Sequence, residues 1–240
     1  MSLPHYAYVA ELLEYPSETF FDRLKNIGKV SSERYPEAVE ELRVFEKLLP
    51  QDIYELQELY CRSFEVQPLT SLYVGYVLFG DDYKRGEMLA NLNVEHRKVG
   101  NELSSELPDF LPNVLKLITK LAEKGDKETL EDVAVRVVAP AVKKMIAEYE
   151  PDSLKAKDEV YKKEFQVLIE ASESVTAFSH CLKAIHTMLE KDFTLIEMSD
   201  EIKDTSFFKF IKKELEIEAK GDTSLGNAAA CATSCSTSCS

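Results

Sequence analysis

The sequence predicts an all-α protein, a multi-helix bundle, and three observations support that fold class. The 240 residues include only 8 Gly and 9 Pro, too few for the many turns of a β-sandwich or β-barrel. The apolar stripes recur with the period of a helix, and none alternates as a half-buried strand does. The composition, 45% hydrophobic and 30% charged, is typical of a globular protein in water.

The first third of the chain is expected to contain several short helices. Two should lie near the N-terminus, and the second should carry Phe20 and Ile27 and end at Gly28. Pro36 suits the first position of the next helix, which we expect over residues 36–49 because Pro50 ends it. A further stripe predicts a helix over residues 53–64.

Residues 71–79 are almost all apolar or aromatic, which predicts a helix buried on most sides at the centre of the fold. A turn at Gly80, Asp81 and Asp82 should then start another helix. Arg85 lies four residues beyond Asp81, so we expect an ion pair between them that fixes this junction.

In the second half, Pro108 and Asp109 should begin a helix that Gly125 ends. Pro140 should kink or break the following helix, because proline removes a backbone donor. From Tyr161 to Leu189 apolar residues recur at every seventh position, which predicts one long helix packed against the bundle. A coiled-coil dimer is the alternative; we favour packing within the chain, and therefore a monomer.

The domain prediction is a single helical domain over residues 1–198. Residues 199–220 are expected to form an acidic C-terminal helix, docked or loose, around the apolar cluster from Phe207 to Leu215. Residues 221–240 consist mainly of Gly, Ala, Ser, Thr and Cys and cannot bury enough apolar surface to offset their ordering entropy. We therefore predict a disordered, cysteine-containing tail.

Charge and hydropathy exclude several classes of partner. Acidic residues give the chain a net charge of −14, which should repel phosphate backbones and argues against nucleic acid. The N-terminus lacks the pattern of a secretory signal, and no apolar run approaches the roughly 18 residues that a membrane span needs. We predict a cytoplasmic protein with no stable membrane insertion.

Signals for catalysis are nearly absent, so we predict no enzyme, no catalytic or metal-binding residues and no cofactor. The chain has no phosphate-binding glycine loop, no His-Glu-x-x-His and no Gly-x-Ser-x-Gly. His180 and His186 point to different faces of one helix and are expected to be ordinary surface histidines. Cys231, Cys235 and Cys239 could bind a soft metal or an iron–sulfur cluster, but we favour an unstructured tail.

Four stretches carry a resemblance to a known family. They are Leu12-Leu13-Glu14-Tyr15-Pro16, Glu58-Leu59-Tyr60 leading to Phe64, the run from Ser71 to Asp81 with Arg85-Gly86, and Glu106-Leu107-Pro108-Asp109-Phe110-Leu111-Pro112. In these stretches the chain resembles the NarJ/TorD-type redox-enzyme maturation chaperones. It is most similar to the nitrate reductase delta subunit, or molybdenum cofactor assembly chaperone. Relatives often carry histidine where this chain has Phe110, so no role of that histidine is transferred.

The resemblance implies an all-helical, TorD-like chaperone with a role in nitrate assimilation. Such a protein binds the N-terminal segment of a molybdoenzyme catalytic subunit, including twin-arginine leaders and unfolded protein. It holds that segment in the cytoplasm until the molybdenum cofactor is inserted, before membrane attachment or export. The candidate peptide-binding residues are Tyr15, Phe64, Tyr73, Tyr76, Phe79, Asp81, Arg85, Pro108, Asp109 and Phe110.

The residues themselves agree with part of this interpretation. An aromatic groove on an acidic protein suits a peptide that is apolar on one face and cationic on the other. The simpler reading of the aromatic run is a helix corner in a core. Two other functions stay open, namely a helix-binding structural subunit of a mature redox complex and a metal or redox protein that uses the C-terminal cysteines.

Overall fold

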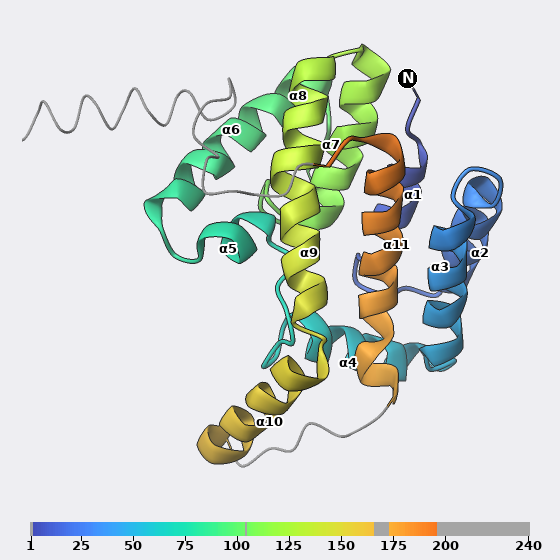
Figure 1. Cartoon of the computed structure of the whole chain (residues 1–240), viewed down its shortest axis with the longest axis vertical. Coiled ribbons are helices and arrows are strands. Elements are labelled where there is room, and N and C mark those ends of the chain that lie inside the picture. The colour runs from blue at the N-terminus through green and yellow to red at the C-terminus, as the bar shows by residue number, and fades with distance from the viewer. Residues whose placement is uncertain (1, 104, 166–172, 196–240) are drawn as a thin grey trace, which may run out of the picture. The chain divides into compact units, whose positions relative to one another are not determined.

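The fold is that of a computed structural model, which describes residues 2–103, 105–165 and 173–195 (Figure 1). Within these ranges every regular element is a helix, and the one β-type contact is an isolated antiparallel bridge between Tyr73 and Phe110. The prediction of an all-α bundle is therefore confirmed. The described residues belong to a compact unit that extends to Met198. The predicted acidic helix and cysteine-containing tail, at residues 199–240, lie outside the described residues and stay predictions.

The first four helices are α1 (His5–Ala10), α2 (Phe20–Ser31), α3 (Pro36–Leu48) and α4 (Ile53–Phe64). Pro36 opens α3 as predicted, and Asp52 caps α4 by accepting a hydrogen bond from the Tyr54 amide at 2.8 Å. The prediction that Gly28 ends a helix is wrong, since α2 continues to Ser31. Glycine weakens a helix interior by about 1 kcal/mol, which is not enough to end a helix that packs on its neighbours.

The aromatic run forms only a short helix, α5 (Val74–Phe79), followed by α6 (Tyr83–Val99). The prediction of a helix buried on most sides is wrong. Val74 and Gly75 are buried, whereas Tyr76 is 45% exposed. The short helix α5 packs against α6, α9 and the π-helix that precedes α9, but this packing leaves Tyr76 uncovered.

The next elements are α7 (Leu111–Lys124), α8 (Lys127–Glu131), the π-helix η1 (Asp132–Val138) and α9 (Ala139–Ala147). Gly125 ends α7 as predicted, in the left-handed conformation that suits glycine. Of the predicted kink or break at Pro140, the break does not occur, because η1 leads directly into α9; the kink stays a prediction. Pro140 lies in the first turn of α9, after the change of helix type, where a missing donor is tolerated.

The predicted single long helix is wrong. The structure has α10 (Pro151–Phe165), a 3-10 turn η2 (Glu173–Thr176) and α11 (Ala177–Asp192), and Figure 1 shows α10 and α11 running in different directions. The two helices contact different partners: Tyr161 of α10 donates to the Pro68 carbonyl at 3.1 Å, whereas Leu182 of α11 is fully buried. A seven-residue repeat shows which residues share one face of a helix. It does not show whether one helix or two carry the whole repeat.

Helix α11 lies between α3 and α9, and α1 packs on α7 (Figure 1). Where α3 and α11 meet α4, the core is aromatic. The ring of Phe178 lies 5.3 Å from that of Phe45 and 4.9 Å from that of Phe64. This core supports the elements from which the candidate site is built.

Candidate peptide-binding site

The backbone joins the two segments that carry most of the candidate residues. The amide of Val74 donates to the Asp109 carbonyl at 2.9 Å, and the amide of Leu111 donates to the Leu72 carbonyl at 2.8 Å. These hydrogen bonds place the start of α5 beside the start of α7. The rings of Tyr73 and Phe110 therefore meet, with their centroids 5.6 Å apart.

Arg85 links α6 to this junction. Its Nε donates to Oδ2 of Asp109 at 3.3 Å, and its guanidinium carbon lies 5.7 Å from the ring centroid of Tyr73 and 5.4 Å from that of Tyr76. Both rings are within the range of a cation–π interaction. We call Tyr73, Tyr76, Arg85, Asp109 and Phe110 the arginine–aromatic cluster. The structure thus brings five of the predicted site residues together.

The predicted ion pair between Asp81 and Arg85 is wrong, because Arg85 pairs with Asp109. Asp81 is exposed in the turn before α6, which begins only at Tyr83. The rule that residues four apart face each other holds within a helix, and Asp81 lies outside it.

Gly75 allows α5 to pack closely on Asp109. A Cβ atom at Gly75 would lie 2.8 Å from Oδ2 of Asp109 and 3.2 Å from Cγ of Arg85, closer than ordinary contacts. The glycine is therefore required by the geometry of the charge pair beneath α5.

The carboxylate of Asp109 is fully buried, whereas the side chain of Arg85 is 21% exposed. Burial raises the pKa of Asp109, although the charge and hydrogen bond of Arg85 act in the opposite direction. Among the described residues, Oδ1 of Asp109 has no hydrogen-bond partner. Arg85 is therefore the charged partner of a carboxylate that backbone hydrogen bonds from Gly75 and Asp109 also stabilise, and its guanidinium lies against two tyrosine rings.

A buried polar network supports the loop before Asp109. Nδ2 of Asn101 lies 2.8 Å from Nδ1 of His96 and 3.1 Å from the Asn113 carbonyl, while Nε2 of His96 lies 3.1 Å from the Pro108 carbonyl. Because the Asn101 amide donates to Nδ1, the imidazole carries its proton on Nε2 and donates it to Pro108. Nδ2 of Asn113 holds the Leu107 carbonyl at 3.1 Å. Burial lowers the pKa of His96, which favours this neutral form.

Tyr73 also connects the cluster with the other predicted aromatics. Its hydroxyl donates to Oε2 of Glu106 at 2.5 Å, and burial together with this hydrogen bond raises the pKa of Tyr73 to about 12. Burial raises the pKa of Tyr60, and the negative charges of Glu65 and Glu106 raise it further. Tyr15 packs edge-on against Tyr60, with the centroids 5.6 Å apart.

The remaining predicted residues lie at different depths. Phe64 is 9% exposed and contributes its ring to the aromatic core, so it lies beneath the surface. Phe79 is half-buried at the last position of α5, and Pro108 is half-buried next to Asp109. Asp81 is exposed and takes no part in the arginine–aromatic cluster.

Large apolar side chains are exposed in, or next to, the segments that carry the candidate residues. They are Tyr15, Val66, Tyr76, Tyr83 and Leu107, which are between 45% and 65% exposed. We call them, together with Phe79, the aromatic surface. Single exposed apolar residues are ordinary, whereas several that share one face are typical of a surface that binds a partner.

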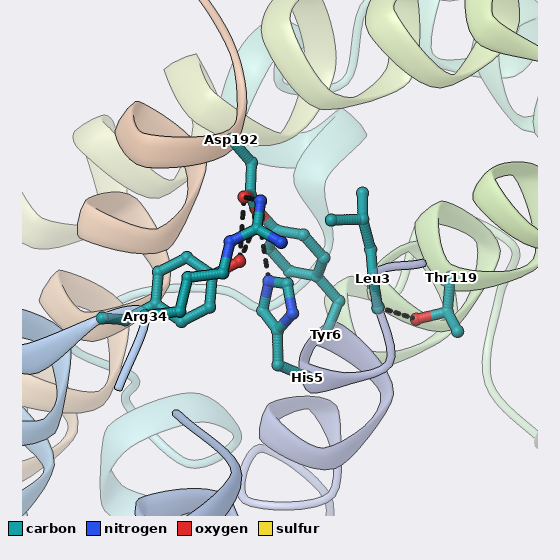
Figure 2. Close-up of polar contacts among 7 residues, drawn as sticks. Leu3, His5, Tyr6, Arg34, Thr119 and Asp192 are labelled. Carbon is teal, nitrogen blue, oxygen red and sulfur yellow. Dashed lines mark hydrogen bonds and ion pairs between the residues drawn. The ribbon is translucent and has the colours of Figure 1, made fainter. Parts of the chain in front are cut away.

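Sequence reasoning missed a second polar cluster, centred on Asp192 at the end of α11 (Figure 2). Its carboxylate is fully buried and accepts hydrogen bonds from His5 at 3.0 Å, Tyr6 at 3.1 Å and Tyr35 at 2.8 Å. Arg34 forms an ion pair with it at 2.5 Å. These partners lie 157 or more residues away in the sequence, so no local signal could have found them.

The Asp192 cluster holds together the two ends of the described chain. Burial alone would raise the pKa of Asp192, but hydrogen bonds from His5 and Tyr35 and the charges of His5 and Arg34 outweigh it and lower that pKa. The carboxylate is surrounded by partners from the fold, among them His5, Tyr6 and Arg34 (Figure 2). We interpret the cluster as structural.

The two histidines that we expected to be ordinary surface residues each lie next to a glutamate. Nδ1 of His180 lies 2.6 Å from Glu41, and Nδ1 of His186 lies 3.5 Å from Glu190. Within the described residues, no group of three or more His, Cys, Asp or Glu side chains is arranged to hold a metal ion. Cys231, Cys235 and Cys239 lie outside those residues, so the metal alternative stays open. None of the helices in the described ranges is long and apolar enough to cross a bilayer.

The described helices agree with the fold class expected from the sequence, an all-α multi-helix bundle. No family model matches the chain. The chain is 28% identical over 124 residues to the probable nitrate reductase molybdenum cofactor assembly chaperone NarW of Escherichia coli (strain K12). The match covers 51% of this chain and 52% of NarW, so the chain spans about half the length of the curated relative.

This comparison confirms the resemblance to the NarJ/TorD-type chaperones at the level of a distant relative. The relative is named as a chaperone and not as an enzyme, which agrees with the prediction of a non-enzymatic protein.

Proposed function

We propose that this protein is a cytoplasmic chaperone for a molybdoenzyme of the nitrate reductase kind. It binds the N-terminal segment of the catalytic subunit, such as a twin-arginine leader, as a monomer. While that segment is bound, the enzyme cannot attach to the membrane or be exported, and the molybdenum cofactor can be inserted. The distant relationship to NarW supports the choice of client.

The observation that carries this proposal is the aromatic surface next to the arginine–aromatic cluster. Tyr76 and Tyr83 are about half exposed, yet Tyr76 contacts Arg85, and Arg85 is held by the buried Asp109. Side chains that are ordered before binding lose little conformational entropy when a partner covers them. Such a surface suits the apolar face of an amphipathic helix.

Charge complements this apolar contact. The net charge of −14 attracts a cationic segment at long range and accelerates its encounter with the protein. Exposed apolar side chains then provide the short-range contact. The preferred client is therefore a peptide with one apolar and one cationic face.

The alternative of a structural subunit in a mature redox complex uses the same surface. The two functions differ in when the partner is bound. A chaperone associates with the cofactor-free precursor and leaves the mature enzyme, whereas a structural subunit is purified with the mature enzyme. Pull-downs of both enzyme forms with the tagged protein separate these functions.

Titration calorimetry tests the proposed binding directly. The probe is a peptide of the first few tens of residues of the nitrate reductase catalytic subunit from the source organism, with a scrambled peptide as control. Ordering the peptide costs about 2 to 5 kcal/mol, so we expect a moderate affinity. The heat-capacity change should be negative, because apolar surface becomes buried. Added salt should slow association, and equal affinity for the scrambled peptide would contradict the proposal.

A further inference from the structure

The α4–α5 loop, residues 65–73, connects the end of α4 with Tyr73 of the arginine–aromatic cluster. Its inner side is bonded to α4, because the amide of Leu69 donates to the Ser63 carbonyl at 3.1 Å. Leu72, near its end, is buried, and its carbonyl accepts the hydrogen bond from the start of α7 that was described above. The path of this loop therefore determines where Tyr73 lies.

One backbone conformation in the α4–α5 loop is unfavourable. Gln67 has a φ of 50°, in the left-handed region that residues other than glycine rarely adopt. Such a conformation persists only where surrounding contacts hold it. The two residues that follow, Pro68 and Leu69, both have carbonyl groups that accept hydrogen bonds from another part of the chain.

Helix α10 provides the donors for these two carbonyl groups. The hydroxyl of Tyr161 donates to the Pro68 carbonyl at 3.1 Å, and Nζ of Lys157 donates to the Leu69 carbonyl. Tyr161 and Lys157 are four positions apart and therefore lie on the same side of α10. Lys157 also forms an ion pair at 2.7 Å with Glu148, the residue that follows α9. The loop is thus bonded to α4 on one side and to α10 on the other.

The rest of α10 packs only lightly on the protein. No side chain of this helix from Pro151 to Lys163 is buried, and Val160 is 47% exposed. Figure 1 shows the helix extending away from α9 and α11. A helix that buries so little apolar surface can separate from its neighbours at a low cost in free energy. Its hydrogen bonds to the α4–α5 loop therefore contribute much of what keeps α10 in place.

We propose that Lys157 and Tyr161 are positioning residues, which hold the α4–α5 loop, and through it Tyr73, in the arrangement that binds the peptide. While α10 is in place, Gln67 keeps its left-handed conformation. When α10 separates, the loop relaxes and the contact between Tyr73 and Arg85 loosens. A protein whose binding-competent state is only partly populated loses affinity in proportion. This inference rests on the proposed peptide-binding function and identifies residues outside the aromatic surface on which the affinity depends.

The test compares two double variants of the full chain. Lys157→Met with Tyr161→Phe, the loop variant, removes both donors to the α4–α5 loop and keeps most of the apolar part of each side chain. Lys155→Met with Tyr54→Phe, the control variant, makes the same changes at exposed positions of α10 and α4. Both variants lose one charge and one hydroxyl, so only the position of the changes differs.

Hydrogen exchange of single amides, measured by NMR, gives a readout that needs no peptide. In the loop variant, the amides of Leu69, Val74 and Leu111 should exchange about tenfold faster than in the parent protein. The amide of Ile118, in the buried helix α7, should keep its rate, because the change is local. In the control variant no rate should change by more than about twofold. Unchanged rates at Val74 and Leu111, or equal acceleration at Ile118, would overturn the positioning role.

Titration calorimetry then measures the effect on binding. The probe is the native N-terminal peptide of the nitrate reductase catalytic subunit from the source organism. We expect the loop variant to bind this peptide about tenfold more weakly than the parent, and the control variant to bind it within about twofold of the parent.

The two measurements separate this inference from the proposed function. If the peptide binds the parent and the loop variant equally well, the chaperone function stands and the positioning role is wrong. If the three amides exchange faster in the loop variant but the peptide does not bind the parent, α10 does position the loop and the choice of client is wrong.

Discussion

Nε of Arg85 donates a hydrogen bond to the fully buried carboxylate of Asp109 at 3.3 Å, although the two residues are 24 positions apart. The pair joins α6 to the start of α7, beneath the short helix α5. Since the guanidinium also lies against Tyr73 and Tyr76, the same residue positions Tyr76 of the aromatic surface. Both the stability of the fold and the binding of a peptide should therefore depend on this ion pair.

Replacing Asp109 with Ala should lower the free energy of unfolding by about 1 to 3 kcal/mol, because Arg85 loses its buried partner. The partial exposure of Arg85 keeps the effect below that of a fully buried pair. Asp81→Ala is the matched control, since Asp81 is exposed and outside the cluster, and it should change stability by less than about 0.5 kcal/mol. Urea unfolding measures both. If Asp81→Ala lowered the stability more than Asp109→Ala, the result would favour the ion pair between Asp81 and Arg85 that the sequence predicted.

Two glycines give opposite expectations for the same substitution. Gly75→Ala should destabilise the protein by about 1 to 3 kcal/mol, because the added Cβ would lie 2.8 Å from the buried Asp109 carboxylate. Gly86→Ala, in α6 with nothing within 4 Å of the added Cβ, should stabilise it by about 0.5 to 1 kcal/mol through helix propensity. Thermal melts of the two variants suffice, and shifts in the same direction would contradict the close packing of α5.

The helical period of the apolar residues correctly predicted those helices whose apolar face packs on the core. Helices α4 and α7 carry such stripes. As the sequence predicts, α4 ends at Phe64 and α7 is ended by Gly125. The helical period failed to predict burial where the same pattern fits both a buried helix and a partly exposed one. The apolar residues of α5 predicted a helix buried on most sides, yet only Val74 and Gly75 are buried and Tyr76 is exposed, because composition does not reveal how many sides of a helix have a neighbour.

The candidate site was predicted only in part, for a similar reason. Tyr73, Tyr76 and Arg85 are close in sequence, so they could be grouped by local spacing. The partner of Arg85 is brought in from a distant loop by the bridge between Tyr73 and Phe110, which no local rule indicates. No pattern in the sequence singles out Asp192, because its partners lie 157 or more residues away.

Asp192→Asn should destabilise the protein by about 2 to 3 kcal/mol, because His5, Tyr6, Arg34 and Tyr35 all lose a charged acceptor. Tyr35→Phe, which removes one hydroxyl donor, should cost about 1 kcal/mol. The exposed Glu18→Gln, which removes the same charge, serves as the control and should cost less than about 0.5 kcal/mol. Equal effects of Asp192→Asn and Glu18→Gln in urea unfolding would show that the cluster contributes nothing.

The Asp192 contribution should also depend on pH in a defined window. The pKa of Asp192 is lower in the folded than in the unfolded protein, so its contribution is present above about pH 4. It should be lost as the pH falls through the folded pKa. The difference in stability between the parent and Asp192→Asn should therefore be constant from neutral pH down to about pH 5 and shrink below about pH 4. A difference that grows on acidification would contradict the lowered pKa.

His96 should make the loop before Asp109 sensitive to acid. Burial lowers the pKa of His96 in the folded protein, so the unfolded chain takes up a proton first, near its ordinary pKa of about 6.5. The free energy of unfolding should therefore fall as the pH decreases from about 7 towards the folded pKa, by about 1.4 kcal/mol for each unit between the two pKa values. The protonated ring would also place a donor at Nδ1 opposite the Asn101 amide, which is itself a donor. Urea unfolding at several pH values, with His96→Gln as the control that cannot titrate, measures this dependence. Parallel pH profiles for the parent and His96→Gln would show that His96 titrates alike in both states, and the neutral, hydrogen-bonded imidazole would then be wrong.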